Sequence, residues 1–265
     1  MDGLDDIAPA RIDAARQRLE RARSIAVLSG AGISTDSGIP DFRGPNGVWT
    51  KNPKAEKAAH ISNYVGDPEH RKRNWQRLAE GSIWAKRDPN DGHRALVDLE
   101  STGHIHTLVT QNVDGLHQAA GSSPDIVVEI HGTTRDVKCL SCGERAPMDR
   151  ALDRVRAGEE DPPCRTCGGI LKSATVSFGQ SLIDEDLGRA EQAALAADVM
   201  LCVGSTLGVY PIARMVPIAH NNGADVVIIN GEPTQFDDIA TDVFHASISE
   251  VLPALVSGLD PVGQT

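Results

Sequence analysis

A glycine-rich segment at residues 30–44, GAGISTDSGIPDFRG, restricts the fold of this chain more than any other feature. It follows directly on the apolar run at 24–29, so a buried strand is predicted to end in a tight turn before a helix. Gly30 and Gly32 have no side chains, and main-chain N–H groups there can approach a pyrophosphate at the positive end of that helix. The segment therefore predicts a nucleotide site at the carboxyl end of a strand.

The spacing of this segment argues against a dehydrogenase. Dehydrogenases of the Rossmann type carry G-x-G-x-x-G, and Thr35 stands here in the position of the third glycine. Residues 39–43, IPDFR, add two apolar side chains, a rigid proline, a carboxylate and a guanidinium. Such a loop can hold a ring as well as a phosphate, so a hydride-transfer function is not favoured.

Short β-branched runs alternate with helical patterns along most of the chain. Strands are expected at 24–29, 105–110, 126–130, 199–204, 225–230 and 242–248. Helices are expected at 10–23, 92–101, 184–197, 211–222 and 249–257. This alternation predicts an α/β fold with a doubly wound, parallel, Rossmann-like sheet, which binds its ligand at the carboxyl ends of the strands.

Two stretches interrupt the alternation and are expected to form a smaller inserted domain with a helical module and a zinc-binding module. The expected parts are 45–88 and 134–175 for the smaller domain, 1–44, 89–133 and 176–257 for the Rossmann-like domain, and 258–265 for a disordered tail. The basic run Arg71-Lys72-Arg73 is expected to form a solvated helix face.

Two C-x-x-C pairs indicate a metal site. Cys139, Cys142, Cys164 and Cys167 place two thiolates on each of two tight turns, and four sulfurs can surround Zn²⁺ tetrahedrally. The number of residues between the two pairs is slightly larger than is usual between the cysteine pairs of a zinc site. A helix-like stretch at 148–157 can accommodate the additional residues. A redox dithiol is the alternative, but it needs only one pair, at a helix start. One structural zinc is predicted, with no coordination position open to water.

Charge and hydropathy restrict the partners and the compartment. The net charge of −11 argues against nucleic acid or an anionic membrane as the main partner and favours basic, lysine-bearing substrates. No apolar run approaches the roughly 18 residues of a membrane span, and the N-terminal MDGLDDIAPARID is acidic, unlike a signal peptide. A cytoplasmic location is expected, where disulfides are rare.

Further motifs follow the glycine loop in a fixed order. They are TQNVDGLH at 110–117, His131-Gly132, the two cysteine pairs, GST at 204–206 and NGEP at 230–233. With these motifs the chain resembles the sirtuins, the NAD-dependent protein-lysine deacylases, from about Ser24 to about Pro253. The segment GPNGVW at 44–49 resembles the chromatin-associated branch of that family, some members of which also transfer ADP-ribose.

The resemblance implies a reaction in which NAD is consumed. The acyl-lysine oxygen attacks C1′ of the ribose, nicotinamide leaves, and the acyl group moves to the 2′-oxygen, giving 2′-O-acyl-ADP-ribose and free lysine. His131 corresponds to the catalytic histidine of the family, and Asn112 is expected to order the ribose and a water molecule. Because a neutral imidazole has a pKa near 6.5, His131 can act as a general base at physiological pH.

The same resemblance assigns the ligand contacts. The nicotinamide pocket is expected to contain Ala31, Ile39, Phe42, Val113 and Asp114. The pyrophosphate is expected to meet Gly30, Gly32, Ser34, Thr35 and Arg43, with Asp41 in the same loop. The ribose and adenosine half is expected to contact Gln111, Gly204, Ser205, Thr206, Asn230, Gly231, Glu232 and Ile248. The substrate peptide is expected to pair with Ser177, Phe178 and Gly179 on one side and Val209 on the other.

The chain departs from the family pattern around the substrate strand. Lys172-Ser173 stands where many members carry Arg-Pro, and Gln180 replaces a glutamate, so peptide binding is expected to differ. No tyrosine and arginine are spaced to bind an acidic acyl group, which favours an uncharged acyl group as substrate.

Two other functions use the same motifs. A mono-ADP-ribosyltransferase would need the same NAD site, and a non-catalytic NAD-binding protein would need only part of it. The complete set of Gln111, Asn112, Asp114 and His131 argues against the non-catalytic alternative. The acyl group, the protein substrates and the oligomeric state are not determined by the sequence.

Overall fold

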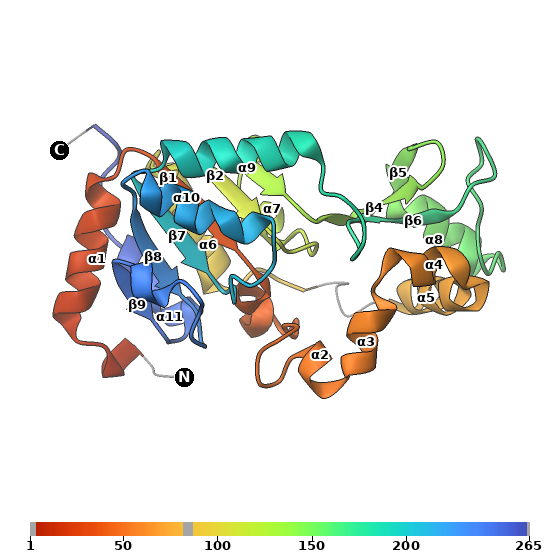
Figure 1. Cartoon of the computed structure of the whole chain (residues 1–265), viewed down its shortest axis with the longest axis horizontal. Coiled ribbons are helices and arrows are strands. Elements are labelled where there is room, and N and C mark those ends of the chain that lie inside the picture. The colour runs from red at the N-terminus through yellow and green to blue at the C-terminus, as the bar shows by residue number, and fades with distance from the viewer. Residues whose placement is uncertain (1–3, 82–86, 264–265) are drawn as a thin grey trace.

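The computed structural model describes residues 4–81 and 87–263, which form a larger and a smaller lobe (Figure 1). The larger lobe contains a six-stranded parallel sheet of order β3-β2-β1-β7-β8-β9. Its strands are β1 (Ile25–Ser29), β2 (Ile105–Thr110), β3 (Val127–Glu129), β7 (Val199–Val203), β8 (Asp225–Ile229) and β9 (Asp242–Phe244). The predicted doubly wound α/β fold is confirmed.

The strand order reverses between β1 and β7, which both lie in the middle of the sheet. Val27 of β1 is in register with Leu108 of β2 on one side and Leu201 of β7 on the other. Every residue of β1 and β7 is buried, as expected for strands covered on both faces. In doubly wound sheets the ligand crevice lies at this reversal, outside the carboxyl ends of the strands.

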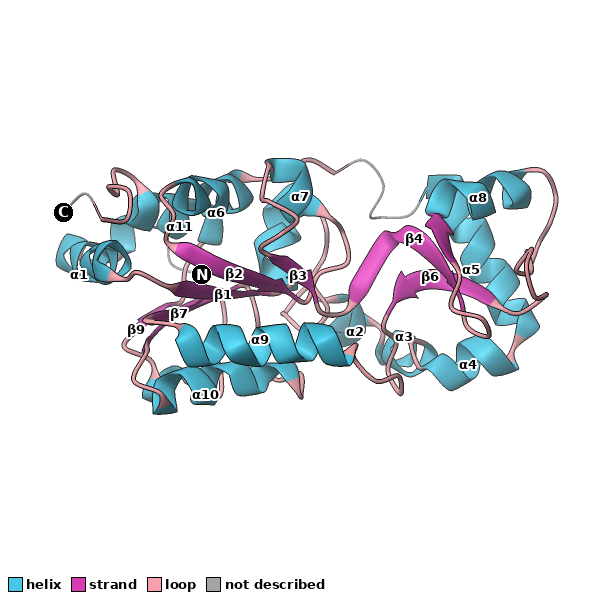
Figure 2. Cartoon of the chain, turned by 90° about the horizontal axis from the view of Figure 1, so that it is seen from above, coloured by secondary structure: helices cyan, strands magenta, loops and turns pink. Residues whose placement is uncertain are grey.

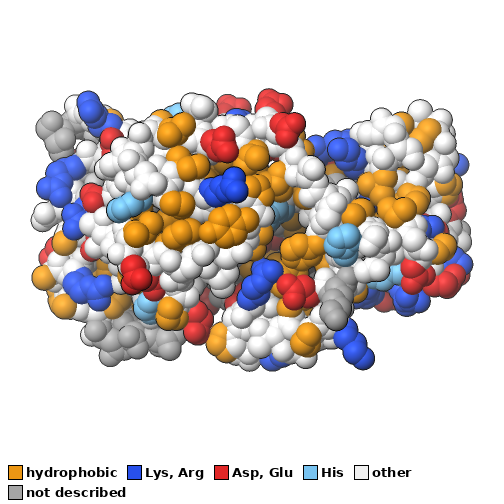
Figure 3. All heavy atoms as spheres, in the orientation of Figure 1, with side chains coloured by type: hydrophobic (Ala, Val, Ile, Leu, Met, Phe, Trp, Pro, Cys, Tyr) orange, Lys and Arg blue, Asp and Glu red, His pale blue; other side chains and the backbone are white. Residues whose placement is uncertain are grey.

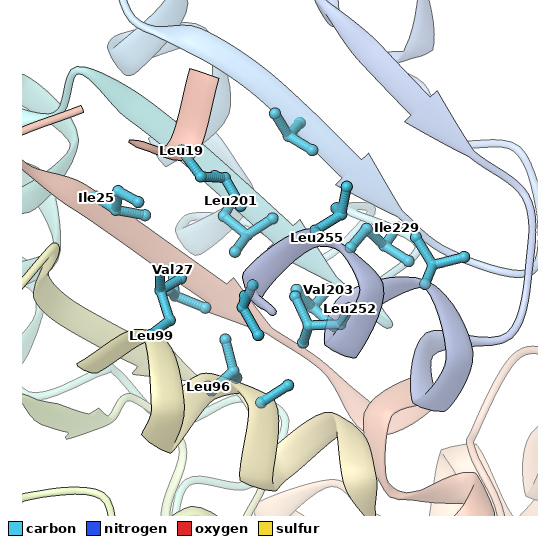
Figure 4. Close-up of a cluster of buried hydrophobic side chains, with 14 of the residues drawn as sticks. Leu19, Ile25, Val27, Leu96, Leu99, Leu201, Val203, Ile229, Leu252 and Leu255 are labelled. Carbon is cyan, nitrogen blue, oxygen red and sulfur yellow. The ribbon is translucent and has the colours of Figure 1, made fainter. Parts of the chain in front are cut away.

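Helices cover both faces of the sheet (Figure 2). One face carries α1 (Pro9–Arg21), α6 (Asp91–Ser101) and α11 (Ile248–Val256), and the other carries α9 (Asp184–Ala196) and α10 (Met215–Asn221). Successive strand residues point to opposite faces, so Val27 packs on the first side and Leu28 on the second. Figure 4 shows Leu96 and Leu99 of α6 and Leu252 of α11 packed over the strands.

The smaller lobe has an antiparallel sheet and a core of its own. Its elements are α2 (Val48–Lys51), α3 (Pro53–Ala58), α4 (Ile61–Gly66), α5 (Pro68–Gly81), β4 (Gly132–Cys139), β5 (Arg145–Pro147), α8 (Met148–Arg156) and β6 (Leu171–Thr175). Trp75 of α5 is fully buried against residues of the sheet and of α8, including Val137 and Leu152. This separate core supports the predicted inserted domain, whose limits remain a prediction. Residues 82–86, inside the expected 45–88 part, lie outside the described residues.

The basic run on α5 differs from its prediction. Arg71 is only 8% exposed, and its guanidinium pairs with Asp161 at 2.9 Å and donates to the carbonyls of Tyr64 and Val65. Asp161 comes from the loop that precedes the second cysteine pair, 90 residues farther along the chain. The expectation of a solvated face was wrong for Arg71, because a distant acidic residue packs against it.

Three differences concern the last part of the chain. The strand expected at 242–248 ends at Phe244, because the chain leaves the sheet and α11 begins at Ile248. The tail expected to be disordered from residue 258 packs against the larger lobe, with Leu259 buried and the Val262 N–H donating to Thr102. Residues 264–265 of that tail lie outside the described residues. The helix expected at 211–222 begins as a 3-10 turn, η3 (Ile212–Arg214), before α10.

No helix in the described ranges combines the length and the apolar character needed to cross a lipid bilayer.

Candidate active site

A cleft of about 1290 Å³ lies between the two lobes, at the carboxyl ends of β1 and β7. On the face shown in Figure 3, hydrophobic side chains gather on both sides of the junction between the lobes. All residues predicted to contact NAD or the substrate peptide line this cleft. From the N-terminal half these are Gly30, Ala31, Gly32, Ser34, Thr35, Ile39, Asp41, Phe42, Arg43, Gln111, Asn112, Val113, Asp114 and His131. From the C-terminal half they are Ser177, Phe178, Gly179, Gly204, Ser205, Thr206, Val209, Asn230, Gly231, Glu232 and Ile248.

The floor of the cleft is formed by two glycine turns in direct contact. The Gly30 N–H donates to Val203 at 2.9 Å, and the Gly32 N–H donates to Gly204 at 2.8 Å. A Cβ atom on Gly32 would lie 2.8 Å from the Gly204 Cα. The two backbones approach too closely for side chains, which leaves a smooth main-chain surface at the strand reversal. The helix expected after the first turn is a 3-10 helix, η2 (Ala31–Ser37).

His131 is held in one tautomer. Its Nδ1 lies 3.1 Å from the carbonyl oxygen of Gln111. A carbonyl can only accept, so Nδ1 carries the proton and the Nε2 lone pair is left to accept one. Burial lowers the pKa of His131 below its usual 6.5, which keeps the ring neutral at physiological pH. The arrangement is that of a general base at a strand end.

Asn112 and Asp114 form a polar network beside the glycine turn. Asn112 Nδ2 donates to the Gly30 carbonyl at 3.1 Å and to Ser34 Oγ at 3.2 Å. Ser34 Oγ donates in turn to Asp114 at 2.8 Å, and the Leu116 N–H, at the start of α7 (Leu116–Ala120), donates to the other carboxylate oxygen at 2.9 Å. Burial raises the pKa of Asp114, and these two donors oppose that rise. With both amide hydrogens engaged, Asn112 Oδ1 is the side-chain atom that can accept a bond from a ligand.

The opposite end of the cleft is organised by side-chain amides. Gln111 Nε2 donates to Ser205 Oγ at 2.9 Å, joining the end of β2 to the turn after β7. Asn230 Nδ2 donates to the Glu232 carbonyl at 2.6 Å and closes the turn after β8. His245 Nδ1 lies 3.1 Å from the Asn230 carbonyl, and its Nε2 lies 3.1 Å from Asp237. No role was predicted for His245, since no motif surrounds it.

An aromatic cluster joins the nucleotide loop to the segment after β6 that carries Phe178. The rings of Phe42 and Trp49 are 4.6 Å apart, and those of Trp49 and Phe178 are 5.4 Å apart. The Arg43 guanidinium lies 4.5 Å from the centre of the Trp49 ring and pairs with Glu56 at 3.2 Å. No role was predicted for Trp49 from the sequence, although it lies in the GPNGVW segment. Its ring therefore connects the nucleotide loop to the segment that carries Phe178.

The turn that carries Phe178 is closed by Gln180. The Ser177 N–H donates to Gln180 Oε1 at 3.0 Å, and the Gln180 N–H donates to the Ser177 carbonyl at 3.0 Å. The Val176 N–H, directly after β6, donates to the His131 carbonyl at 2.7 Å, so this segment is fixed to the backbone of His131. The Ile61 N–H, at the start of α4 in the smaller lobe, donates to the Phe178 carbonyl at 2.9 Å.

The four cysteines of the two C-x-x-C pairs come together in the smaller lobe. Their sulfur atoms all lie within 4.8 Å of one another, with Cys139 and Cys167 at 3.5 Å and Cys142 and Cys164 at 3.8 Å. A tetrahedral zinc site with Zn–S bonds of about 2.3 Å has sulfur atoms about 3.8 Å apart, so the cluster fits Zn²⁺. The fifth cysteine, Cys202, is buried in β7, where burial raises its pKa and leaves it an inert apolar side chain.

Comparisons with known proteins agree with this geometry. The model of the Sir2 family matches residues 30–211. The "NAD-dependent protein deacetylase 2" of Streptomyces coelicolor is 49% identical over 235 residues, covering 89% of this chain and 97% of that protein. A solved structure of a Sir2 variant with deacetylated p53 peptide and 3′-O-acetyl-ADP-ribose has a TM-score of 0.83 and 32% identity, covering 92% of this chain and 97% of its own. A structure of Sir2 with p53 peptide and NAD⁺ has a TM-score of 0.78 and 34% identity, covering 89% and 93%.

Proposed function

The chain belongs to the Sir2 family, and we propose that it acts as an NAD-dependent protein-lysine deacylase in the cleft between its lobes. The observation that carries this function is the state of His131. The ring is neutral, its tautomer is fixed by Gln111, and it lines the cleft together with Phe178, which follows β6. A deacylase needs such a base on the ribose, and a protein that only binds NAD does not.

NAD is the co-substrate: the acyl-lysine oxygen displaces nicotinamide at C1′, and with water the acyl group passes to the ribose 2′-oxygen while lysine leaves as the amine. His131 Nε2 accepts the proton of a ribose hydroxyl, which makes that oxygen a nucleophile. Asn112 Oδ1 and the Asp114 carboxylate supply oriented oxygens where positive charge develops. The cluster of Phe42, Trp49 and Phe178 keeps water from the reacting centre.

The zinc would be held by Cys139, Cys142, Cys164 and Cys167. Four thiolates fill its coordination sphere, so it would stabilise the smaller lobe and leave catalysis to the cleft.

The substrates we propose are proteins that carry acylated lysines. The acidic chain, with a net charge of −11, favours such basic partners over nucleic acid and anionic membranes. A cytoplasmic location fits the thiolate metal site, which a reducing compartment preserves.

Mass spectrometry of the products tests the function. With NAD and an acetyl-lysine peptide, the protein should release nicotinamide, deacetylated peptide and O-acetyl-ADP-ribose in equal amounts. His131→Ala is the control, and it should form all three products more slowly than the wild type. Release of nicotinamide with ADP-ribose attached to protein, and no O-acetyl-ADP-ribose, would instead establish the mono-ADP-ribosyltransferase alternative.

A further inference from the structure

A histidine that has no part in the chemistry described above lies behind the turn that follows β8. His245 comes directly after β9, the strand that pairs with β8 at one edge of the sheet (Figure 1). Among the residues that the structure describes, its neighbour Ala246 lines the cleft and His245 does not. The His245 side chain is partly exposed and is not part of the hydrophobic core, so a substitution there leaves the core intact.

His245 fixes the backbone of Asn230, the first residue of that turn. The pairing of β8 with β9 ends at Ile229 and Phe244. The Asn230 N–H still donates to the Phe244 carbonyl at 3.0 Å, and the Asn230 carbonyl lies 3.1 Å from His245 Nδ1. A carbonyl can only accept, so Nδ1 carries a proton and donates it. The imidazole thus holds the chain one residue beyond the end of the strand pairing.

The other ring nitrogen holds the far end of the same segment. His245 Nε2 lies 3.1 Å from Oδ2 of Asp237, at the start of the 3-10 turn η4 (Asp237–Ile239). Oδ1 of that carboxylate accepts from Thr234 Oγ1 at 2.6 Å and from the Thr234 N–H at 3.2 Å. His245 therefore joins the first residue of the segment 230–237 to the last, and Asp237 sets the orientation of the ring.

The part of the segment between these two contacts faces the cleft. Asn230, Gly231 and Glu232 line it, and Asn230 Nδ2 closes the turn by donating to the Glu232 carbonyl at 2.6 Å. Burial raises the pKa of Asp41, and the nearby charge of Glu232 adds to that rise, so Glu232 lies near the nucleotide loop. The shape of this turn therefore decides how its backbone and side chains meet a nucleotide in the cleft.

We propose that His245 is a positioning residue for the adenosine half of NAD, and that it acts by holding the Asn230 carbonyl. This inference rests on the proposed function, which places NAD in the cleft, and extends it to a residue behind the cleft wall. A turn that is already held in its binding shape loses less conformational freedom when the ligand binds. The general base His131 follows β3, at the opposite edge of the sheet from β9, so His245 should affect nucleotide affinity and not the chemical step.

Titration calorimetry with ADP-ribose tests the proposal, because this ligand carries the adenosine half of NAD and has no nicotinamide to release. His245→Leu removes the donor, and the Kd for ADP-ribose should rise about five- to tenfold, as for the loss of one hydrogen bond. His245→Asn can place its Nδ2 where Nδ1 of the imidazole lies, and it should bind within about threefold of the wild type. His220→Leu, at an exposed position near the end of α10, is the matched control and should leave the Kd unchanged.

Steady-state kinetics with an acetyl-lysine peptide separate positioning from a general loss of structure. In His245→Leu the KM for NAD should rise by about the same factor as the Kd, while kcat and the KM for the peptide change less than about twofold. An unchanged Kd in His245→Leu, equal weakening in His245→Leu and His245→Asn, or a parallel loss of kcat would overturn the proposal. A wild type that binds ADP-ribose but does not deacylate the peptide would refute the proposed function alone, and one that does not bind ADP-ribose would overturn both.

Discussion

Replacing Gly204 by alanine should damage both the stability and the NAD site of this protein. Gly204 has φ of 64°, in the left-handed region, where a Cβ atom costs about 1–2 kcal/mol. The new Cβ would lie 2.3 Å from the Ile33 nitrogen and 2.7 Å from the Gly32 carbonyl carbon. Both are backbone atoms of η2, which the Gly32 N–H holds to the Gly204 carbonyl, so the contact can be relieved only by separating the two glycine turns. Overpacking of this kind adds about 1–3 kcal/mol, for a total of about 2–5 kcal/mol.

The assay is thermal unfolding together with the KM for NAD. For a chain of this size, about 2–5 kcal/mol corresponds to a fall in Tm of at least about 4 °C. Separation of the turns should also raise the KM for NAD. The control is Gly208→Ala, four residues farther along, where the nearest atom to a new Cβ is Thr206 Oγ1 at 3.7 Å. If Gly204→Ala matched Gly208→Ala in both measurements, the close approach of the two turns would not be the basis of the site.

Three further predictions concern the general base and the metal site. His131→Ala should lower deacylation by at least about 10²-fold while NAD binding, measured by calorimetry, is retained, and near-normal turnover would remove His131 from the mechanism. His131 must be neutral to accept a proton, and burial lowers its pKa. As the pH falls, kcat/KM should therefore stay constant through pH 7 and decline only below pH 6.5. A decline of kcat/KM centred above pH 7 would contradict this effect of burial. Cys139→Ala should lose the zinc and the folded smaller lobe, because metal binding and folding are coupled; elemental analysis and circular dichroism check this, and a zinc-free variant with unchanged unfolding would refute it.

Much of the fold was predictable because it depends on local patterns. The buried strands from Ile25 and from Val199 are continuous apolar runs, and such runs between helical patterns allow few arrangements other than a doubly wound sheet. The limits of elements were less predictable. The strand at Asp242 is shorter than its apolar pattern, because sheet pairing ends where the partner strand ends.

The candidate site was predictable to the extent that its residues sit in motifs. Glycines that permit close backbone contact, a histidine at a strand end and two cysteine pairs are visible along the chain. Trp49 was not assigned, because it contacts Phe178, which lies far from it in the sequence. His245 was not assigned, because it pairs with Asp237 and neither residue lies in a motif. Distances in sequence carry no information on such contacts.

The sequence by itself determined the class of fold and the cysteines that would bind the metal, since both follow from short-range spacing and residue chemistry. The residues that line the cleft were predicted from the resemblance of its motifs to the Sir2 family. The tertiary structure alone decided which charged groups are buried and which of them are paired with an opposite charge. Arg71 and Lys172 are both basic residues, and both are buried. Arg71 finds Asp161, whereas Lys172 finds only neutral oxygens. Whether a buried charge meets an opposite charge depends on which distant segments pack around it, and that packing sets how much its burial costs.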